Sequence, residues 1–449
     1  MIRIGNDLFR TNSLILIVFI LTGFITKDVS AQDKEKVLSL QEVIALNKAQ
    51  NISVKIAETE SAGLTEDFKD AKQAVLPTIT TGGSYQRYSR ALFFEDGLGG
   101  IRSAARRPGQ NGANLNMEAS FNVFSGGKTN ALIEEQQIRK DLGKINIADQ
   151  SGSSSLQVTA HYLDLVRQYD LRQIIADQIK RAHTRLRNVN SLYKNQRVTK
   201  SDVLRAELGL SNAELNKVSN DNDITILHQK INVLLNIDES SIIIPADSAD
   251  TPRPSLAMIN EILGTVEENA YDILKADKNI KIQSAKVKAI KSNYYPSVSL
   301  ISSYGFNYPN ALFYPPIDQL YSIGYVGARI TYNLSSLYQN KHKYQAGKIR
   351  LSGMEQQKQL VQRNTNQKVQ AYLIKYKEAL NRVEVMKKSI SQAVVNYRIV
   401  NTKYLNQLAL LTDLLDADNL LQEARFSLST AQTNASLMYY HILYTSGNL

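Results

Sequence analysis

Residues 193–206 read YKNQRVTKSDVLRA, and residues 404–417 read YLNQLALLTDLLDA. The two stretches share a tyrosine, an Asn-Gln pair, a hydroxyl residue before an aspartate and a Leu-x-Ala ending, all at an offset of 211 residues. Ser201-Asp202 and Thr412-Asp413 stand where a helix would begin, and their side chains can cap free N–H groups there. The stretches therefore predict the tips of two long helical hairpins, which turn at about 195–201 and 406–412.

The repeat extends beyond these tips. Lys72 and Pro77 match Lys291 and Pro296 at an offset of 219, and Ala119 matches Ala328 at an offset of 209. The change in offset predicts a loop about ten residues longer in the first half. We divide the chain into a first repeat at 32–237, a linker at 238–255 with room for one short strand, and a second repeat at 256–449.

The first 31 residues have the features of a secretory signal peptide. Basic residues precede the apolar run 14–21, and the small residues Val29 and Ala31 suit cleavage before Gln32. An uncleaved membrane anchor is the alternative, but the run is shorter than the roughly 20 residues that span a bilayer. The chain has no cysteine, which excludes disulfides and an acylated N-terminal cysteine.

Net charge and proline positions limit the class of protein. The formal charge is +11, but basic residues are spread among glutamates along expected helices, so we expect no nucleic-acid partner. The nine prolines leave 109–244 and 317–449 free for very long helices. Shorter helices are predicted at 38–76 and at about 259–295, each ending at a proline, the first with apolar positions at Leu40, Val43, Ile44, Ile52 and Ile56.

Four segments alternate between apolar and polar residues, as strands with one apolar face do. They lie near 78–90, 114–124, 297–308 and 322–334, and loops at 91–113 and 310–320 join them in pairs. Each is long enough to cross a bilayer when tilted. Six tyrosines at the ends of these segments could form an interfacial girdle: Tyr85, Tyr88, Tyr304, Tyr308, Tyr321 and Tyr325. The alternative is that the segments form two hairpins of a soluble sandwich.

The long helices resemble coiled coils. One apolar seam runs through Ala182, Leu186, Val189 and Tyr193, and a second runs through Ala424, Leu428, Ala431, Ala435, Met438 and Ile442. The roughly 65 residues from Lys128 to the first tip would form a rod on the order of 100 Å long. Four strands cannot close a membrane barrel, so three copies are expected to supply twelve strands and a helical wall.

The order of these features resembles the TolC family of outer-membrane efflux channels, over essentially the whole mature chain. The resemblance implies a mainly α fold, with antiparallel helical hairpins that form an α-barrel and four strands per chain in a 12-stranded trimeric β-barrel. It implies a homotrimer in the outer-membrane lipid of a Gram-negative bacterium, extending into the periplasm. A periplasmic adaptor (membrane fusion) protein and an inner-membrane RND or ABC transporter would be its partners.

Site residues follow from this resemblance only where the sequence matches. Asp413 and Asp416 correspond to aspartates that ring the periplasmic aperture, and Asp202 and Tyr404 to gate residues; capping alone is the other role open to Asp202 and Asp413. Ala409 replaces the basic gate partner, so packing of Tyr404, Leu408 and Leu411 is expected to hold the tip. Gln196 and Gln407 replace tip glycines, within the expected adaptor-binding residues Asn195, Gln196, Arg197, Asn406, Gln407 and Leu408.

Catalysis finds no support in the sequence. The five histidines are isolated from one another: His161, His183, His228, His342 and His441. The sequence contains no metal-binding motif and no nucleophile motif, and we expect no cofactor. The main prediction is a passive export channel. The alternative is a periplasmic coiled-coil scaffold that does not insert into a membrane.

Overall fold

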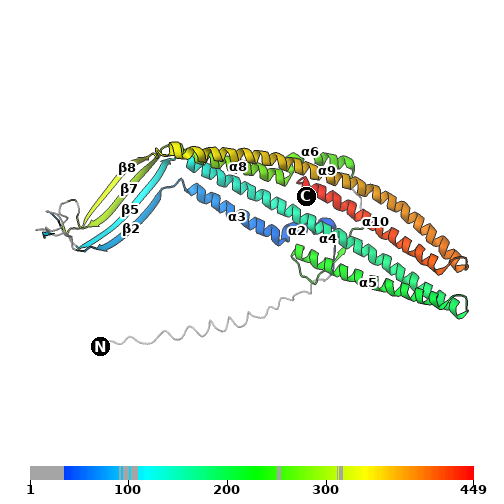
Figure 1. Cartoon of the computed structure of the whole chain (residues 1–449). Coiled ribbons are helices and arrows are strands. Elements are labelled where there is room, and N and C mark those ends of the chain that lie inside the picture. The colour runs from blue at the N-terminus through cyan, green and yellow to red at the C-terminus, as the bar shows by residue number, and fades with distance from the viewer. Residues whose placement is uncertain are drawn as a thin grey trace, which may run out of the picture.

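The computed structural model describes residues 35–89, 93–94, 101–102, 110–249, 254–310, 312 and 317–449. A β-sheet forms one end of an elongated molecule, and the tips of two helical hairpins form the other end (Figure 1). The predicted signal peptide at 1–31 and parts of both predicted strand loops and of the linker lie outside the described residues. No helix in the described ranges is both long and apolar enough to cross a membrane.

The two halves repeat one order of elements, as the sequence predicts. The first half contains β1 (Glu35–Leu38), α2 (Leu40–Gln50), α3 (Ile52–Gln73), β2 (Thr78–Arg87), β3 (Phe93–Phe94), β4 (Ile101–Arg102), β5 (Asn111–Phe124), α4 (Lys128–Lys194) and α5 (Lys200–Leu235). After β6 (Ile242–Pro245), the second half contains α6 (Leu256–Gly264), α7 (Val266–Asn269), α8 (Tyr271–Lys291), the short 3-10 helix η1 (Ser292–Tyr294), β7 (Ser297–Tyr308), β8 (Tyr321–Thr331), α9 (Ser336–Leu405) and α10 (Leu411–Thr445).

The main sheet is antiparallel, in the order β2-β5-β7-β8. Its register places apolar residues opposite one another, as in Met117 with Tyr304, Phe121 with Leu300 and Val298 with Ile330. Directly paired residues share a face of a sheet, so one apolar face continues across the four strands. The other face carries mostly Ser, Thr and Asn, for example Ser120, Asn122 and Ser299.

The register corrects part of the predicted tyrosine girdle. Tyr85, Tyr304 and Tyr308 lie on the apolar face, but Tyr321 and Tyr325 pair with Asn307 and Ser303 and therefore lie on the polar face.

The last strand ends at Thr331, before the predicted boundary, because Asn333 accepts a hydrogen bond from the Ser335 N–H in the turn before α9. The loop at 88–110 is longer than the loop at 309–320, as the offsets predict.

The helices form a wall that is four helices wide. Next to the sheet the order across the wall is α3-α4-α8-α9, and toward the tips it is α5-α4-α10-α9 (Figure 1). α4 has 67 residues and α9 has 70, and both run the full height of the wall. The wall and the sheet therefore have the same edges, with β2, α3 and α5 on one side and β8 and α9 on the other.

The prediction of one helix at 38–76 is wrong in two details. A break at Asn51 divides it into α2 and α3, because the Asn51 side chain caps α3 by accepting hydrogen bonds from the N–H groups of Ser53 and Val54. Ile52 and Ile56, predicted on the apolar face, are exposed because α3 lies at an edge of the wall.

The short strand predicted in the linker is present as β6. It pairs in parallel with β1, a strand that the sequence did not reveal.

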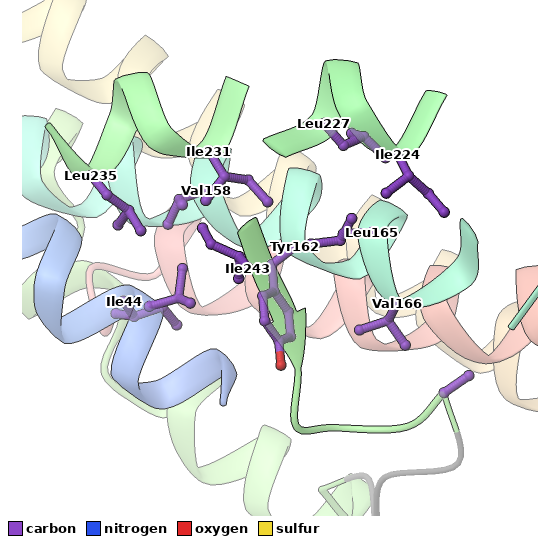
Figure 2. Close-up of a cluster of buried hydrophobic side chains, with 12 residues drawn as sticks. Ile44, Val158, Tyr162, Leu165, Val166, Ile224, Leu227, Ile231, Leu235 and Ile243 are labelled. Atoms are coloured by element: carbon purple, nitrogen blue, oxygen red, sulfur yellow. The ribbon is translucent and has the colours of Figure 1, made fainter. Parts of the chain in front are cut away.

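A buried core at mid-height joins α2, α4, α5 and β6, with Val158, Tyr162, Ile231 and Ile243 at its centre (Figure 2). The single O–H of Tyr162 is shared between two acceptors, the Leu38 carbonyl (2.8 Å) and Asp247 Oδ2 (2.9 Å). The core thus attaches β1, β6 and Asp247 to α4.

Helix α4 passes close to its neighbours at the same height. A Cβ atom on Gly152 would come within 3.2 Å of the rings of Tyr271, which begins α8, and Tyr444, near the end of α10. Gly152 belongs to the run Ser-Gly-Ser-Ser-Ser at 151–155. Small side chains there let the ends of α8 and α10 pack against α4.

Candidate functional site at the hairpin tips

The two hairpin turns lie where the repeated stretch predicts them, within a residue or two. α4 ends at Lys194 and α5 begins at Lys200, and α9 ends at Leu405 and α10 begins at Leu411. The six residues predicted to bind an adaptor all lie in these turns and are exposed. Both turns lie at the end of the molecule opposite the sheet (Figure 1).

Each turn terminates its helix with the same hydrogen-bond pattern. The N–H groups of Gln196 and Arg197 donate to the carbonyls of Tyr193 and Leu192, and the N–H groups of Gln407 and Leu408 donate to those of Tyr404 and Lys403. This Schellman pattern requires a left-handed residue, for which glycine is favoured. Gln196 (φ 55°) and Gln407 (φ 61°) take that conformation instead.

Replacing both glutamines by glycine should therefore stabilise the tips. A side chain in the left-handed region costs roughly 1–2 kcal/mol, part of which is offset because glycine gains more freedom in the unfolded chain. We expect Gln196→Gly with Gln407→Gly to raise the temperature at which a protease cleaves the turns. Gln196→Ala with Gln407→Ala is the control, because alanine keeps the strain, and an equal rise in the alanine variant would refute this explanation.

The aspartates that follow the turns cap the second helix of each hairpin. Thr199 is the cap residue of α5, and Asp202 Oδ2 accepts hydrogen bonds from the Thr199 N–H (2.9 Å) and hydroxyl (2.7 Å). Asp413 Oδ2 accepts from the Leu410 N–H at 3.0 Å. Ser201 and Thr412 lie inside the helices rather than at the cap, so the aspartates, and not the hydroxyls beside them, make the predicted capping contacts.

Tyr404 lies in an apolar cluster that joins the two tips, together with Val189, Val203, Leu411 and Leu414. Its side chain is 6% exposed, and among the described residues its hydroxyl has no hydrogen-bond partner. Burial raises the pKa of this hydroxyl, and the negative charge of Asp202 raises it further. Tyr404 and Asp202 are thus near each other, but the structure does not join them by a hydrogen bond.

Leu408 corrects one prediction about the tip. Tyr404 and Leu411 pack as expected and Ala409 contacts their cluster, but the Leu408 side chain is 76% exposed in the turn. Asp413 and Asp416 are also exposed, one helical turn apart on α10. Their lining of an aperture stays a prediction.

The sequence interpretation missed a buried ion cluster just above the tips. Asp418 on α10 accepts from Arg181 Nε through Oδ1 (2.8 Å) and from the Arg185 guanidinium through Oδ2 (2.5 Å). The side chains of Asp418 and Arg185 are 3% and 7% exposed. The cluster joins the first hairpin to the second, and it provides an ionic contact that the alanine at 409 cannot supply.

A signal for this cluster was present in the spacing of apolar residues. On α10 the buried positions Leu411, Leu414, Asp418 and Leu421 alternate in steps of three and four, which places a carboxylate in an apolar seam. On the last part of α4, from residue 182 to the tip, the buried residues are Ala182, Arg185 and Val189. Leu186 is half-buried and Tyr193 is exposed, so the predicted α4 seam was displaced by one residue in its middle, and Arg185 was overlooked.

The histidines have separate surroundings. Within the described ranges, His228 Nε2 lies 3.1 Å from the Ile243 carbonyl and the His441 ring stacks on Tyr372. No group of three or more possible metal ligands occurs in the part of the chain that the structure describes.

Solved structures with the same fold include several bacterial outer-membrane proteins. The chain is 15% identical to VceC, an outer membrane protein of Vibrio cholerae, with 91% of this chain and 96% of VceC covered and a TM-score of 0.75. It is 17% identical to the open state of the MtrE outer membrane channel of Neisseria gonorrhoeae, with 91% and 88% covered and a TM-score of 0.72. The CmeC outer membrane channel of Campylobacter jejuni is 15% identical, with 91% and 85% covered and a TM-score of 0.72.

No family model and no curated protein matches the sequence. The structural matches confirm the fold that the resemblance to the TolC family implies, with strands at one end and long helical hairpins at the other.

Proposed function

We propose that this protein is the outer-membrane channel of a tripartite efflux or type I secretion system. The observation that carries the proposal is the continuous apolar face of the sheet, which stands on a helical wall with the same two open edges. An isolated sheet with open edges is unstable in lipid, so copies must join edge to edge. Three copies would form a 12-stranded barrel that continues into a helical tube.

In this arrangement the apolar face contacts outer-membrane lipid, and the polar face lines a water-filled passage. Helices as long as α4 and α9 span on the order of 100 Å, so the tips would lie deep in the periplasm. The protein would be a passive conduit and not an enzyme. An inner-membrane RND or ABC transporter would supply the energy through a periplasmic adaptor.

Membrane fractionation followed by mass measurement in mild detergent tests the proposal. We expect a trimer that is extracted from outer membranes only with detergent and that forms conducting pores in planar bilayers. A protein released as a soluble monomer or coiled coil would instead support the periplasmic scaffold.

The exposed turns are the proposed adaptor contact, because they lie farthest from the sheet. Replacing Gln196 and Gln407 by glutamate should abolish export, since six new charges would surround the tips of a trimer. Trimer mass and insertion should be unchanged, because neither side chain packs against the core. The glycine pair described above is the control that should still export, and normal export by the glutamate pair would exclude tip docking.

Asp413 and Asp416 are the proposed aperture residues. Three copies would place exposed carboxylates in two rings, which favour cations in a narrow passage. We expect Asp413→Asn with Asp416→Asn to reduce the preference for cations and to weaken block by trivalent cations from the periplasmic side. Bilayer recordings measure both effects, with Glu423→Gln as a control elsewhere on α10, and identical selectivity in all three proteins would leave only the capping role of Asp413.

A further inference from the structure

A cavity of about 290 Å³ lies between the two hairpins, close to the tips. Three basic residues of α4 line it, Lys180, Arg181 and Arg185, and so do Tyr397 and Tyr404 of α9. None of the described residues that line this space is acidic. The cavity is therefore a positively charged space at the contact between the first hairpin and the second.

The buried charges beside this cavity do not balance. Arg181 and Arg185 share the single carboxylate of Asp418, which accepts one hydrogen bond from each guanidinium. Within the described residues, neither arginine forms an ion pair with a second carboxylate. The side chains of Asp418, Arg185 and Arg181 are 3%, 7% and 20% exposed, so water screens this cluster little. One positive charge is left over, and a buried charge without a partner is costly.

Three buried donor groups at this cavity have no hydrogen-bond partner in the part of the chain that the structure describes. They are Arg181 Nη2, Arg185 Nε and the hydroxyl of Tyr404. Arg185 and Tyr404 are 7% and 6% exposed. Burial raises the pKa of Tyr404, so its hydroxyl keeps its proton at neutral pH and can donate. Since buried donors are nearly always satisfied in folded proteins, three of them around one cavity indicate a ligand that accepts hydrogen bonds.

An oxyanion meets both requirements, because it carries the missing negative charge and has several acceptor oxygens. Guanidinium groups bind carboxylate and phosphate oxygens through charge-assisted hydrogen bonds, with a planar fork that suits these groups. The Arg181 guanidinium lies over the Tyr397 ring, 5.7 Å from its centroid. This contact holds the guanidinium in one plane and so limits the directions in which its free N–H groups can donate.

We propose that the cavity binds a small oxyanion that carries a phosphate or carboxylate group, with Arg181, Arg185 and Tyr404 as its donors. The exposed Lys180 adds a further positive charge to the site. The two arginines belong to the first hairpin and Tyr404 to the second, so a bound anion joins the hairpins and resists their separation. The site does not rest on the proposed function, because all of its residues belong to one chain.

Anion titration of the mature protein in detergent tests the site, with phosphate replacing chloride at constant pH and ionic strength. We expect calorimetry to show saturable binding of one phosphate per chain. The unfolding temperature should rise with phosphate concentration, because a ligand that binds only the folded state stabilises it. Acetate is the second probe, and the tighter of the two identifies the preferred group. If neither probe binds saturably, the proposal is overturned.

Tyr404→Phe is the sharpest variant, because it removes one donor and keeps the ring that packs at the tips. In chloride it should unfold no earlier than the wild type, since its hydroxyl has no partner among the described residues. Its affinity for phosphate should fall about tenfold, the usual effect of losing a hydrogen bond to a charged group. Wild-type affinity in this variant would place the anion elsewhere.

Two charge variants on α4 separate a site from a response to overall charge. Lys180→Gln removes a positive charge that lines the cavity, whereas Arg187→Gln removes an exposed one that does not line it. We expect only the Lys180 variant to bind phosphate more weakly. Equal weakening in both variants would mean that phosphate responds to net charge, and the proposed site would be wrong.

Proteolysis tests the bridge between the hairpins. Phosphate should slow cleavage of the turns in the wild type and much less in Tyr404→Phe, which lacks the donor from the second hairpin. Saturable binding without slower cleavage would overturn the bridge and leave only the binding site.

Discussion

Replacing Val326 by arginine is expected to prevent insertion into the outer membrane. The Val326 side chain is 85% exposed and stands at the middle of β8, and its partner Ser302 belongs to the same face as Leu300 and Tyr304. An arginine at the centre of a lipid-facing strand costs about 2–4 kcal/mol, and a trimer would carry that cost three times. The measurement is the amount of folded trimer recovered from outer membranes.

The next residue in the same strand is the matched control. Gly327 lies on the polar face, where its Cβ would meet open space. We expect Gly327→Arg to insert and to change the conductance of the pore instead. Equal insertion of the two variants would refute the assignment of the apolar face to lipid.

Replacing Asp418 by alanine is expected to destabilise the tip half of the molecule by about 3–5 kcal/mol per chain, the usual cost of removing one partner from a buried ion pair. Arg185 would then be a buried cation without its carboxylate, and Arg181 would lose the partner of its Nε. We expect a lower temperature for loss of the helical circular dichroism signal in detergent, and faster proteolysis of α5 and α10.

Two control variants distinguish this effect from simple loss of volume. Asp418→Leu with Arg185→Leu removes the two most deeply buried charges of the cluster and leaves Arg181, whose side chain is 20% exposed, so it should regain most of the stability, since replacing a buried pair is often neutral. Asp413→Ala removes an exposed carboxylate and should cost only about 1 kcal/mol through the lost cap contact. Equal unfolding temperatures of the Asp418→Ala and Asp413→Ala variants would contradict a stabilising role of the buried ion cluster.

The fold could be predicted because its signals are repeated and long. Two copies of the tip stretch, prolines confined to a few places and four alternating segments each point to the same arrangement. The errors occurred where one residue decides the outcome, as at Asn51, whose side chain caps α3 and breaks the helix. The pairing of β1 with β6 joins segments some 200 residues apart, and no local pattern reveals such a contact.

The candidate site was predicted only in part. The turns and the capping aspartates follow from local sequence, because a helix end depends on the few residues around it. The Asp418 cluster depends on how the two hairpins pack against each other. The predicted seam of α4 ran through Leu186 instead of Arg185, so Arg185 was not predicted to be buried. Similarly, the exposure of Leu408 follows from the left-handed turn at Gln407, which a sequence rich in leucine does not suggest.

The arrangement of α4 and α9 also has a mechanical consequence. These two helices run unbroken from the sheet to the tips, whereas α3 and α5, and likewise α8 and α10, succeed each other at mid-height (Figure 1). A torque applied at the tips can pass that height along a continuous backbone only in α4 and α9. In α4 the same height carries the run 151–155, in which glycine, a poor helix former, stands next to serines, a combination at which helices can bend. We therefore expect twisting of the tips relative to the sheet to load α4 and α9 most strongly at this height, which the buried core around Tyr162 reinforces.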